Sequence, residues 1–365
     1  MNVPLISSVD DRRCADALAA LCGGVSEHDS AGPQVAFPER LLDPSTIRSG
    51  WVAPISDLGV LCVSGDDALR FLQSQLTNDL EGLPEGAWQL SGYCSAKGRL
   101  LASLMIWRCP DGIRILASQP LTAGLRKRLS MFVLRAKVRI SDEGDQWHLF
   151  GIGGEQASMA LSKLGMSLPG ANCAVTVGSQ HILGCSQVAL PGSSPGSTRA
   201  LVSRSLLLVP TGDAPQVWAA LRTSLGSAPS TAWRWTEVLS GIPRIVPAGV
   251  ERFVPQMVNL DLAGGVSFRK GCYPGQEVVA RSHYLGKLKR RMFLAQVDGN
   301  APDSGTDVHG SDGSEPCGEV VLSAPSPFGG ALVLFESQIA AAGGARLPDG
   351  RLLNLLELPY AISGG

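Results

Sequence analysis

The chain has 365 residues, which is more than one ordinary hydrophobic core accommodates and suits two or three units. Hydrophobic residues make up 44% and charged residues 17%, a balance that excludes a disordered chain and is typical of a globular protein. The formal net charge is −1, so no overall field attracts nucleic acid and any basic partner surface must be local.

The sequence also lacks the usual signs of membrane, secretion and metal. No apolar run approaches the ~20 residues of a membrane helix, and the first residues show no secretory signal. The nine cysteines are scattered without a C-x-x-C pair, and the five histidines form no H-x-x-x-H pair. We therefore expect no membrane contact, no disulfide framework and no metal site. Reduced thiols indicate a cytoplasmic setting.

The predicted elements mix helices and strands without a regular βαβ alternation, which favours an α+β fold. Residues 1–45 form an N-terminal extension with one short helix at 10–21. Pro110-Asp111-Gly112 lies between two apolar runs and predicts a hairpin over 100–118. Further helices are expected at 65–76, 122–132, 155–164, 214–225 and 230–239, and further strands at 52–56, 60–64, 137–140, 147–152, 175–177, 181–190 and 200–209.

The pattern changes after about residue 285. Short strand-like runs separated by Gly, Pro, Asp and Ser follow to the end of the chain. They predict a small all-β module, a sandwich or a barrel, over 286–365, after a mixed region over 46–285.

One thiol has surroundings that favour reactivity. Cys272 lies in the stretch KGCYPGQEVVAR, beside Gly271 and close to Lys270 and Arg269. Positive neighbours and exposed backbone N–H groups lower the pKa of a thiol. The alternative is an inert, half-buried cysteine in a turn. His283 is a candidate base, although the spacing does not require it.

Two earlier stretches carry polar groups that can either bind a ligand or form hydrogen bonds within the chain. FLQSQLTNDL at 71–80 places Asn78 and Asp79 at a helix end, where capping is their commoner role. CSAKGR at 94–99 reads as a turn whose two cations can face an anionic ligand.

The run KLKRR at 287–291 is a candidate tRNA contact. Basic residues bind a phosphate backbone, but lysines on an edge strand also block aggregation and are often only solvated. The four cations concerned are Lys287, Lys289, Arg290 and Arg291.

Residues 241–291 resemble the signature region of the YgfZ family, folate-binding proteins related to the aminomethyltransferase, or T-protein, of the glycine cleavage system. The family motif K-G-C-[YF]-x-G-Q-E is matched in full by residues 270–277. FLQSQLTNDL and CSAKGR resemble earlier family blocks in the same order. The resemblance spans about residues 51–295.

The resemblance implies two entwined α+β subdomains and a C-terminal β-barrel around a central folate cleft. Tetrahydrofolate would place its ring against Trp233 and its glutamate tail near basic side chains such as Arg281. The other folate-binding residues that we expect are Lys270, Gly271, Tyr273, Gln276, Glu277, Asn78 and Asp79. The family is linked to iron–sulphur enzymes, including those that methylthiolate tRNA, and Cys272 would act in redox protection or in contact with a cluster or client thiol.

Two departures from the related proteins affect the predicted chemistry. Leu58 occupies a position where the family has a tryptophan, and an aliphatic side chain cannot stack on a pterin. Ala102-Ser103 replace the acidic pair that the T-protein needs, and neither can accept a proton at neutral pH. We therefore expect an accessory protein, with a folate-dependent aminomethyl transferase as the alternative.

Overall fold

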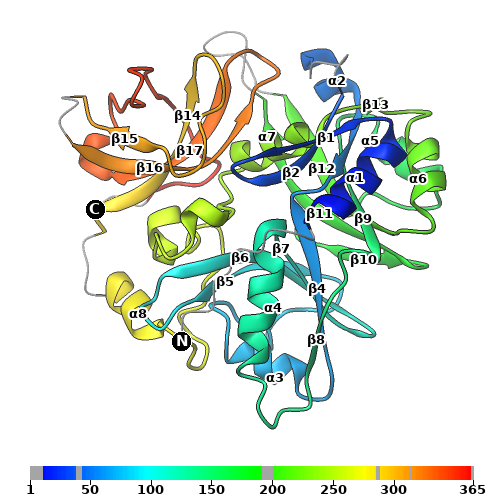
Figure 1. Ribbon diagram of the computed structural model, residues 1–365, viewed down its shortest axis with the longest axis horizontal. Helices are drawn as coiled ribbons and strands as arrows, with labels where there is room; N and C mark the ends of the chain where they lie inside the picture. The colour runs from blue at the N-terminus through cyan, green and yellow to red at the C-terminus, as the bar shows by residue number, and fades with distance from the viewer. Residues whose placement is uncertain (1–10, 38–42, 191–199, 285–287, 312–314, 363–365) are drawn as a thin grey trace.

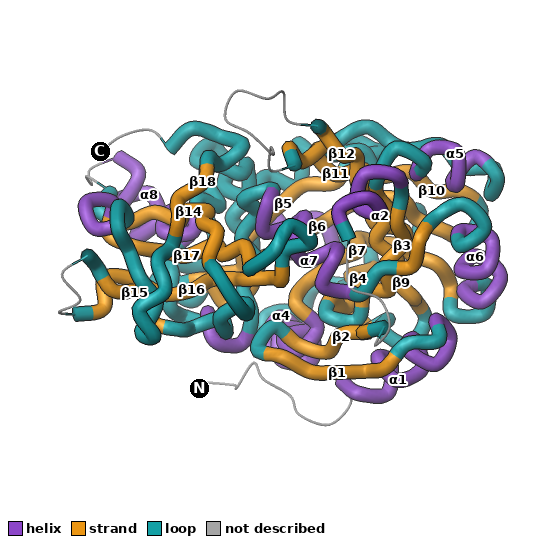
Figure 2. Tube along the Cα trace, turned by 90° about the horizontal axis from the view of Figure 1, so that it is seen from above, coloured by secondary structure: helices purple, strands orange, loops and turns teal. Residues whose placement is uncertain are grey.

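The structure is a computed structural model that describes residues 11–37, 43–190, 200–284, 288–311 and 315–362 (Figure 1). The described strands form two large central sheets, a third sheet near the C-terminus and one small N-terminal hairpin. Seen from above, the C-terminal sheet and the six-stranded sheet lie at opposite ends of the molecule, with β5, β6 and α7 between them (Figure 2). No helix in the described part of the chain is long and apolar enough to cross a bilayer.

The six-stranded sheet carries helices and the N-terminal hairpin on its surface. Its order is β10-β11-β12-β9-β3-β13, antiparallel except for the β3–β13 pair. Leu18 and Val35, from the region expected to be an extension, share a core with Phe150 and Trp218. The elements here are α1 (Asp11–Cys22), β1 (Val25–Asp29), β2 (Gly32–Ala36), α2 (Pro44–Ser49), β3 (Trp51–Ile55), β9 (Trp147–Gly153), α5 (Ala157–Ser162), β10 (Ala174–Val177), β11 (Gln180–Ala189), β12 (Leu201–Pro210), α6 (Ala214–Leu221) and β13 (Gly226–Ser227).

The five-stranded central sheet is built between β3 and β9, so the two sheets are interleaved along the chain. Its order is β5-β6-β7-β4-β8, and every pair is antiparallel. The predicted hairpin is confirmed as β6 and β7, with Pro110-Asp111 at its turn and Gly112 paired with Cys109. The elements are β4 (Leu58–Ser64), α3 (Ala68–Gln73), β5 (Trp88–Cys94), β6 (Leu100–Cys109), β7 (Gly112–Ser118), α4 (Thr122–Ser130) and β8 (Arg139–Asp142).

The C-terminal sheet has the order β15-β16-β17-β14-β18, all antiparallel. Isolated bridges join His309 to Arg346 and Arg346 to Leu352, between the edge strands β15 and β18. The all-β module is thus confirmed as a bridged five-stranded sheet, and its closure into a barrel stays a prediction. Its strands are β14 (Arg290–Val297), β15 (Asp307–His309), β16 (Pro316–Pro325), β17 (Ala331–Gln338) and β18 (Asn354–Leu356).

Helix α7 (Ser230–Leu239) joins these sheets. All but one of its residues are buried, since it packs on β3, β9 and β11 on one side and on β16 and β17 on the other. A helix buried all round must neutralise its charged side chains internally. Arg234 and Glu237 are the charged residues that it carries.

A buried ion cluster satisfies that requirement. Asp57 lies in the turn between β3 and β4, where the chain passes from one large sheet to the other. Its Oδ2 accepts hydrogen bonds from Arg234 Nη2 at 2.7 Å and from Arg244 Nη2 at 2.7 Å. Burial raises the pKa of Asp57, but the guanidinium groups of Arg244 and Arg234 outweigh it and hold the pKa at about 2. Arg234 also pairs with Asp29 of the N-terminal hairpin.

Replacing Asp57 by Asn tests this cluster. The change removes the carboxylate that two buried guanidinium groups share and leaves Arg234 with Asp29 and Arg244 with Glu237. We therefore expect urea unfolding to show a loss of about 3–5 kcal/mol. Because the folded pKa lies below the unfolded value of ~3.9, the carboxylate's contribution is complete above about pH 4 and is lost as pH falls toward 2. The difference between wild type and Asp57→Asn should therefore shrink in acid.

The matched control is Asp66→Asn. Asp66 pairs with Lys137 at 3.0 Å, but both side chains are more than three-quarters exposed, so this change should cost about 0–1 kcal/mol. Equal losses for the two variants would show that the buried cluster does not hold the sheets together.

Candidate functional site

Lys270 of the cysteine motif caps helix α3. Its Nζ donates hydrogen bonds to the carbonyl oxygens of Gln73, of Leu76 at 2.7 Å and of Asn78 at 3.0 Å. Burial lowers the pKa of Lys270 to about 8, against the opposing charges of Asp79 and Glu81. The ammonium group therefore ties the motif to FLQSQLTNDL.

The same motif touches the CSAKGR turn through glycines. Gly275 and Gly98 both have positive φ, +80° and +71°. A Cβ on Gly275 would lie 2.5 Å from the Ser95 carbonyl oxygen, and one on Gly98 would lie 2.8 Å from Val278 Cβ. Two backbones can approach this closely only where side chains are absent. The structure thus brings together three of the four stretches that the sequence analysis singled out: the cysteine motif, FLQSQLTNDL and CSAKGR.

Asn78 and Asp79 bond to the protein itself. Asn78 Nδ2 donates to the carbonyl oxygens of Leu90 and Gly264, each at 2.8 Å. The hydrogen bond from Gln73 Nε2, at 2.9 Å, is the main cause that lowers the pKa of Asp79. These are the helix-end and turn contacts of such residues, and a direct ligand contact stays a prediction.

The motif thiol is on the surface. All nine cysteines lie in the described residues, and Cys272 is the one that is exposed. Gly271 is exposed beside it, whereas Tyr273 is buried, with its ring 5.5 Å from Lys270 Nζ. Burial raises the pKa of Tyr273. The described residues hold no group of three or more His, Cys, Asp or Glu that could bind a metal.

Helix α8 (Gln276–Tyr284) follows the thiol directly. Gln276 is half-buried at its start, and the side chains of Glu277 and Arg281 are exposed. His283 stacks on Phe268 with ring centroids 3.7 Å apart. These placements leave the folate-binding roles predicted for Gln276, Glu277 and Arg281 untested.

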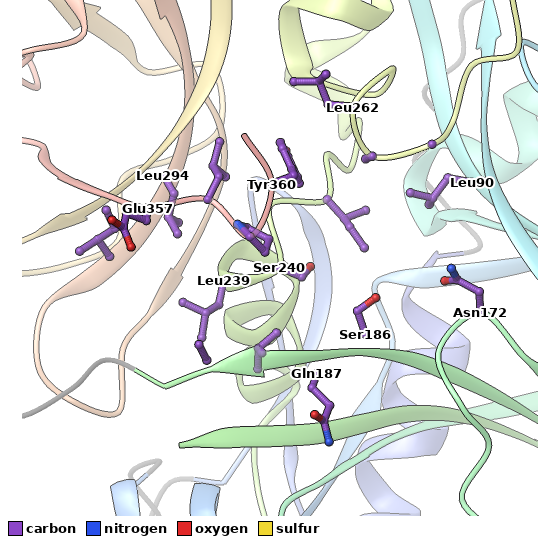
Figure 3. Close-up of a pocket in the computed structure, with 18 of the residues that line it drawn as sticks. Leu90, Asn172, Ser186, Gln187, Leu239, Ser240, Leu262, Leu294, Glu357 and Tyr360 are labelled. Atoms are coloured by element: carbon purple, nitrogen blue, oxygen red, sulfur yellow. The ribbon is translucent and has the colours of Figure 1, made fainter. Parts of the chain in front are cut away.

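A cavity of about 700 Å³ lies where the sheets meet, between α7, β11, β5, β14 and the C-terminal segment (Figure 3). Asn172, Ser186 and Ser240 face it from different elements. Of the described residues that line it, Trp88 alone carries an indole ring. The lining residues are Trp88, Gln89, Leu90, Asn172, Ser186, Gln187, Val188, Ala189, Leu239, Ser240, Ile242, Leu262, Ala263, Gly264, Leu294, Gln296, Leu356, Glu357, Leu358, Pro359 and Tyr360.

A β-bulge places polar groups at this cavity. The register of β11 against β12 shifts between Cys185 and Val188, so Ser186 and Gln187 are left unpaired and exposed. Arg204 Nε donates to the carbonyl oxygen of Ser186 at 3.2 Å and so fixes the bulge. A bulge carries no reliable sequence signal, which is why Ser186 and Gln187 were missed.

Trp233 lies behind this wall. Its side chain is buried, and the Arg204 guanidinium lies over the ring, 5.2 Å from the centroid. A Cβ at Gly151 would approach the ring to 2.6 Å, so the glycine makes room for it. Trp233 is not among the described residues that line the cavity. It supports the bulge through Arg204, and stacking on a folate stays a prediction.

The residues at which the resemblance implied departures from related proteins lie elsewhere. Leu58 lines a second cleft of about 590 Å³, formed by α1, α4, β8 and neighbouring loops. Ala102 and Ser103 are buried in β6, where Ser103 Oγ accepts a hydrogen bond from the Ile245 N–H at 2.9 Å.

The cations of KLKRR differ in their exposure and in their ion pairs. Lys287 lies outside the described residues, and Lys289 is exposed. Arg290 pairs with Glu336, and buried Arg291 pairs with Asp261 at 2.7 Å. A tRNA contact through this run stays a prediction, with two of its cations already bound to carboxylates.

The fold has a solved counterpart. The aminomethyltransferase T of the glycine cleavage system from Bartonella henselae superposes with a TM-score of 0.75 at 16% identity, over 94% of this chain and 96% of that protein. This likeness confirms the expected T-protein-like fold of mixed α and β structure.

Sequence comparison gives closer relatives, although no family model matches the chain. The tRNA-modifying protein YgfZ of Edwardsiella ictaluri is 38% identical over 234 residues, 63% of this chain and 66% of that protein. The protein of the same name from Klebsiella pneumoniae is 31% identical over 273 residues, 74% of this chain and 80% of that protein. This chain therefore belongs to the YgfZ family.

Proposed function

We propose that this protein binds a folate in the central cavity and supports tRNA modification in the cytoplasm. The cavity of about 700 Å³ carries the proposal, because small-molecule sites measure roughly 300–1,000 Å³ and combine apolar walls with a few polar groups. The family name of its relatives, tRNA-modifying protein, supports the role in tRNA modification. The resemblance of residues 241–291 to a folate-binding family, together with the T-protein-like fold, supports the ligand.

The chemistry of the lining suits a pteridine ring. Such a ring is flat and carries hydrogen-bond donors and acceptors along its edge. Asn172, Ser186 and Ser240 offer both kinds of group, and Trp88 and Leu239 provide an indole and an apolar wall. No lysine or arginine is among the described lining residues. The glutamate tail would therefore leave the cavity and meet cations outside it, for which Arg281 is our candidate.

Cys272 would serve a separate step. Its exposed thiol can reach another protein without entering the cavity, which suits redox protection of an iron–sulphur enzyme or transient contact with its cluster. One cysteine does not hold a cluster, so the client would supply the other ligands. An accessory role fits Ala102 and Ser103, whose side chains carry no acid. Sustained transfer of a one-carbon unit from a donor to tetrahydrofolate would support the transferase alternative instead.

Filling the cavity tests the ligand site. In Ser186→Trp the indole would occupy the space in front of the bulge, so calorimetric titration with tetrahydrofolate under anaerobic conditions should show affinity at least about tenfold weaker than wild type. Ser186 is exposed, so the variant should fold normally. Trp233→Ala would be a less clear test of the ligand site, because removing a buried indole costs about 3–5 kcal/mol of stability.

The control is Ser141→Trp, which places the same side chain in the second cleft beside Leu58. Its folate affinity should match the wild type. Weak binding by Ser141→Trp together with normal binding by Ser186→Trp would move the folate to the second cleft and refute the proposed site.

Replacing Cys272 by Ala separates the thiol from the cavity. We expect tRNA methylthiolation, measured by mass spectrometry of nucleosides from a strain that carries only the variant, to fall to the level of a strain without the protein. Folate affinity should stay within about twofold, because Cys272 does not line the cavity. Cys173→Ala, at a half-buried cysteine, is the control. Normal methylthiolation in the Cys272→Ala strain would remove the thiol from the mechanism.

A further inference from the structure

The segment from α4 to the start of β8 carries a group of cations that does not line the proposed folate cavity. We call residues 126–139 the basic tip; it projects from the end of α4 in Figure 1. The sequence contains no Asp or Glu from 112 to 141, so this stretch has no acidic residue of its own. Its cations are Arg126, Lys127, Arg128, Arg135, Lys137 and Arg139.

Most of these cations are available to a partner. Arg126, Lys127, Arg135 and Arg139 are exposed, and no ion pair engages their side chains in the part of the chain that the structure describes. Lys137 is different, since its Nζ lies 3.0 Å from Asp66 Oδ2. The contrast with KLKRR is clear, because Arg290 and Arg291 both face carboxylates.

Large apolar side chains stand among the cations. Met131, Phe132 and Leu134 are 46%, 45% and 88% exposed. The loop that carries them has a defined conformation: Leu134 has φ +45°, the Ala136 N–H donates to the Val133 carbonyl oxygen at 2.8 Å, and the Lys137 N–H donates to Asp67 Oδ2 at 2.8 Å. An exposed ring between cations is the arrangement that stacks on an unpaired base.

The positive surface continues beside the tip. Arg126 and Arg139 also line the cleft of about 590 Å³, to which α1 contributes Arg13. Two carboxylates, Asp142 and Asp145, line it as well, and Asp145 Oδ1 accepts a hydrogen bond from Cys14 Sγ at 2.9 Å. Three arginines, one each from α1, α4 and β8, thus line the cleft beside the tip.

We propose that the basic tip and these cleft arginines bind the phosphate backbone of a structured RNA, with Phe132 against an unpaired base. Four exposed cations from α4, the loop after it and β8, which form no ion pair among the described residues, match the charge of a phosphodiester chain. The proposal rests on the role in tRNA modification proposed above, which makes a tRNA the RNA to test. An acidic protein surface or an anionic membrane would use the same charges and would overturn the assignment.

The test is fluorescence anisotropy with an unmodified, labelled tRNA transcript at several salt concentrations. The triple variant Lys127→Gln, Arg135→Gln, Arg139→Gln should bind at least about tenfold more weakly at 0.1 M salt. The slope of log affinity against log salt should also fall by about 2–3, because each lost phosphate contact removes roughly 0.7–0.9. The control triple, Arg48→Gln, Lys163→Gln, Arg222→Gln, changes the net charge equally at exposed cations elsewhere and should bind like the wild type.

Phe132→Ala tests the stacking contact separately from the charges, because it leaves the net charge unchanged. It should weaken binding to the tRNA but leave binding to a fully paired RNA duplex unchanged, since a duplex offers no unpaired base. Equal tRNA binding by the two triple variants would overturn the proposal. So would a tip variant that keeps tRNA binding but loses binding to phosphatidylglycerol vesicles.

The outcome is separable from the proposed function. The RNA assay contains neither folate nor client enzyme. If the tip variant binds tRNA normally while Cys272→Ala still abolishes methylthiolation, the RNA surface is wrong and the role in tRNA modification stands. If the tip variant loses tRNA binding while methylthiolation persists in the Cys272→Ala strain, the RNA surface stands and the thiol mechanism fails.

Discussion

The buried carboxylate of Asp57 is the interaction on which the rest of the architecture depends. It lies where the chain leaves the six-stranded sheet for the five-stranded one, and it binds Arg234 of α7 and Arg244 just beyond that helix. Glu237 contacts Arg244 at 3.2 Å. A charge at this depth is tolerated only when it is paired, so the relative positions of both sheets and α7 are fixed together. Ser240, which follows α7, is thereby set at the cavity.

The cysteine motif and the cavity are distinct but mechanically connected. Lys270 binds the carbonyl oxygen of Asn78, and the Asn78 amide binds the carbonyl oxygens of Leu90 and Gly264, both of which line the cavity. The motif therefore shapes the wall of the proposed folate site from outside, while Cys272 faces solvent. In the proposed function, this arrangement would let one short stretch of sequence serve both the folate cavity and the thiol that contacts a client protein.

Local signals in the sequence predicted local structure well. The β6–β7 hairpin follows from Pro110-Asp111-Gly112, and α7 begins and ends where its pattern indicated. What sequence reasoning missed depends on distant contacts: Trp233 is covered by Arg204, and the partners of Arg290 and Arg291 come from β17 and the loop at Asp261. A run of basic residues does not show which carboxylates elsewhere in the chain pair with it. The sequence alone therefore made the cations of KLKRR look more available to a partner than they are. The tip cations were overlooked because they are spread over a helix, a loop and a strand.

A crystal structure with bound tetrahydrofolate would test the central claim most directly. The account predicts the pteridine ring in the cavity between Trp88, Ser186 and Ser240, with the glutamate tail directed outward and Cys272 free of the ligand. A ring bound in the cleft beside Leu58, or no ligand in either place at saturating concentration, would contradict it.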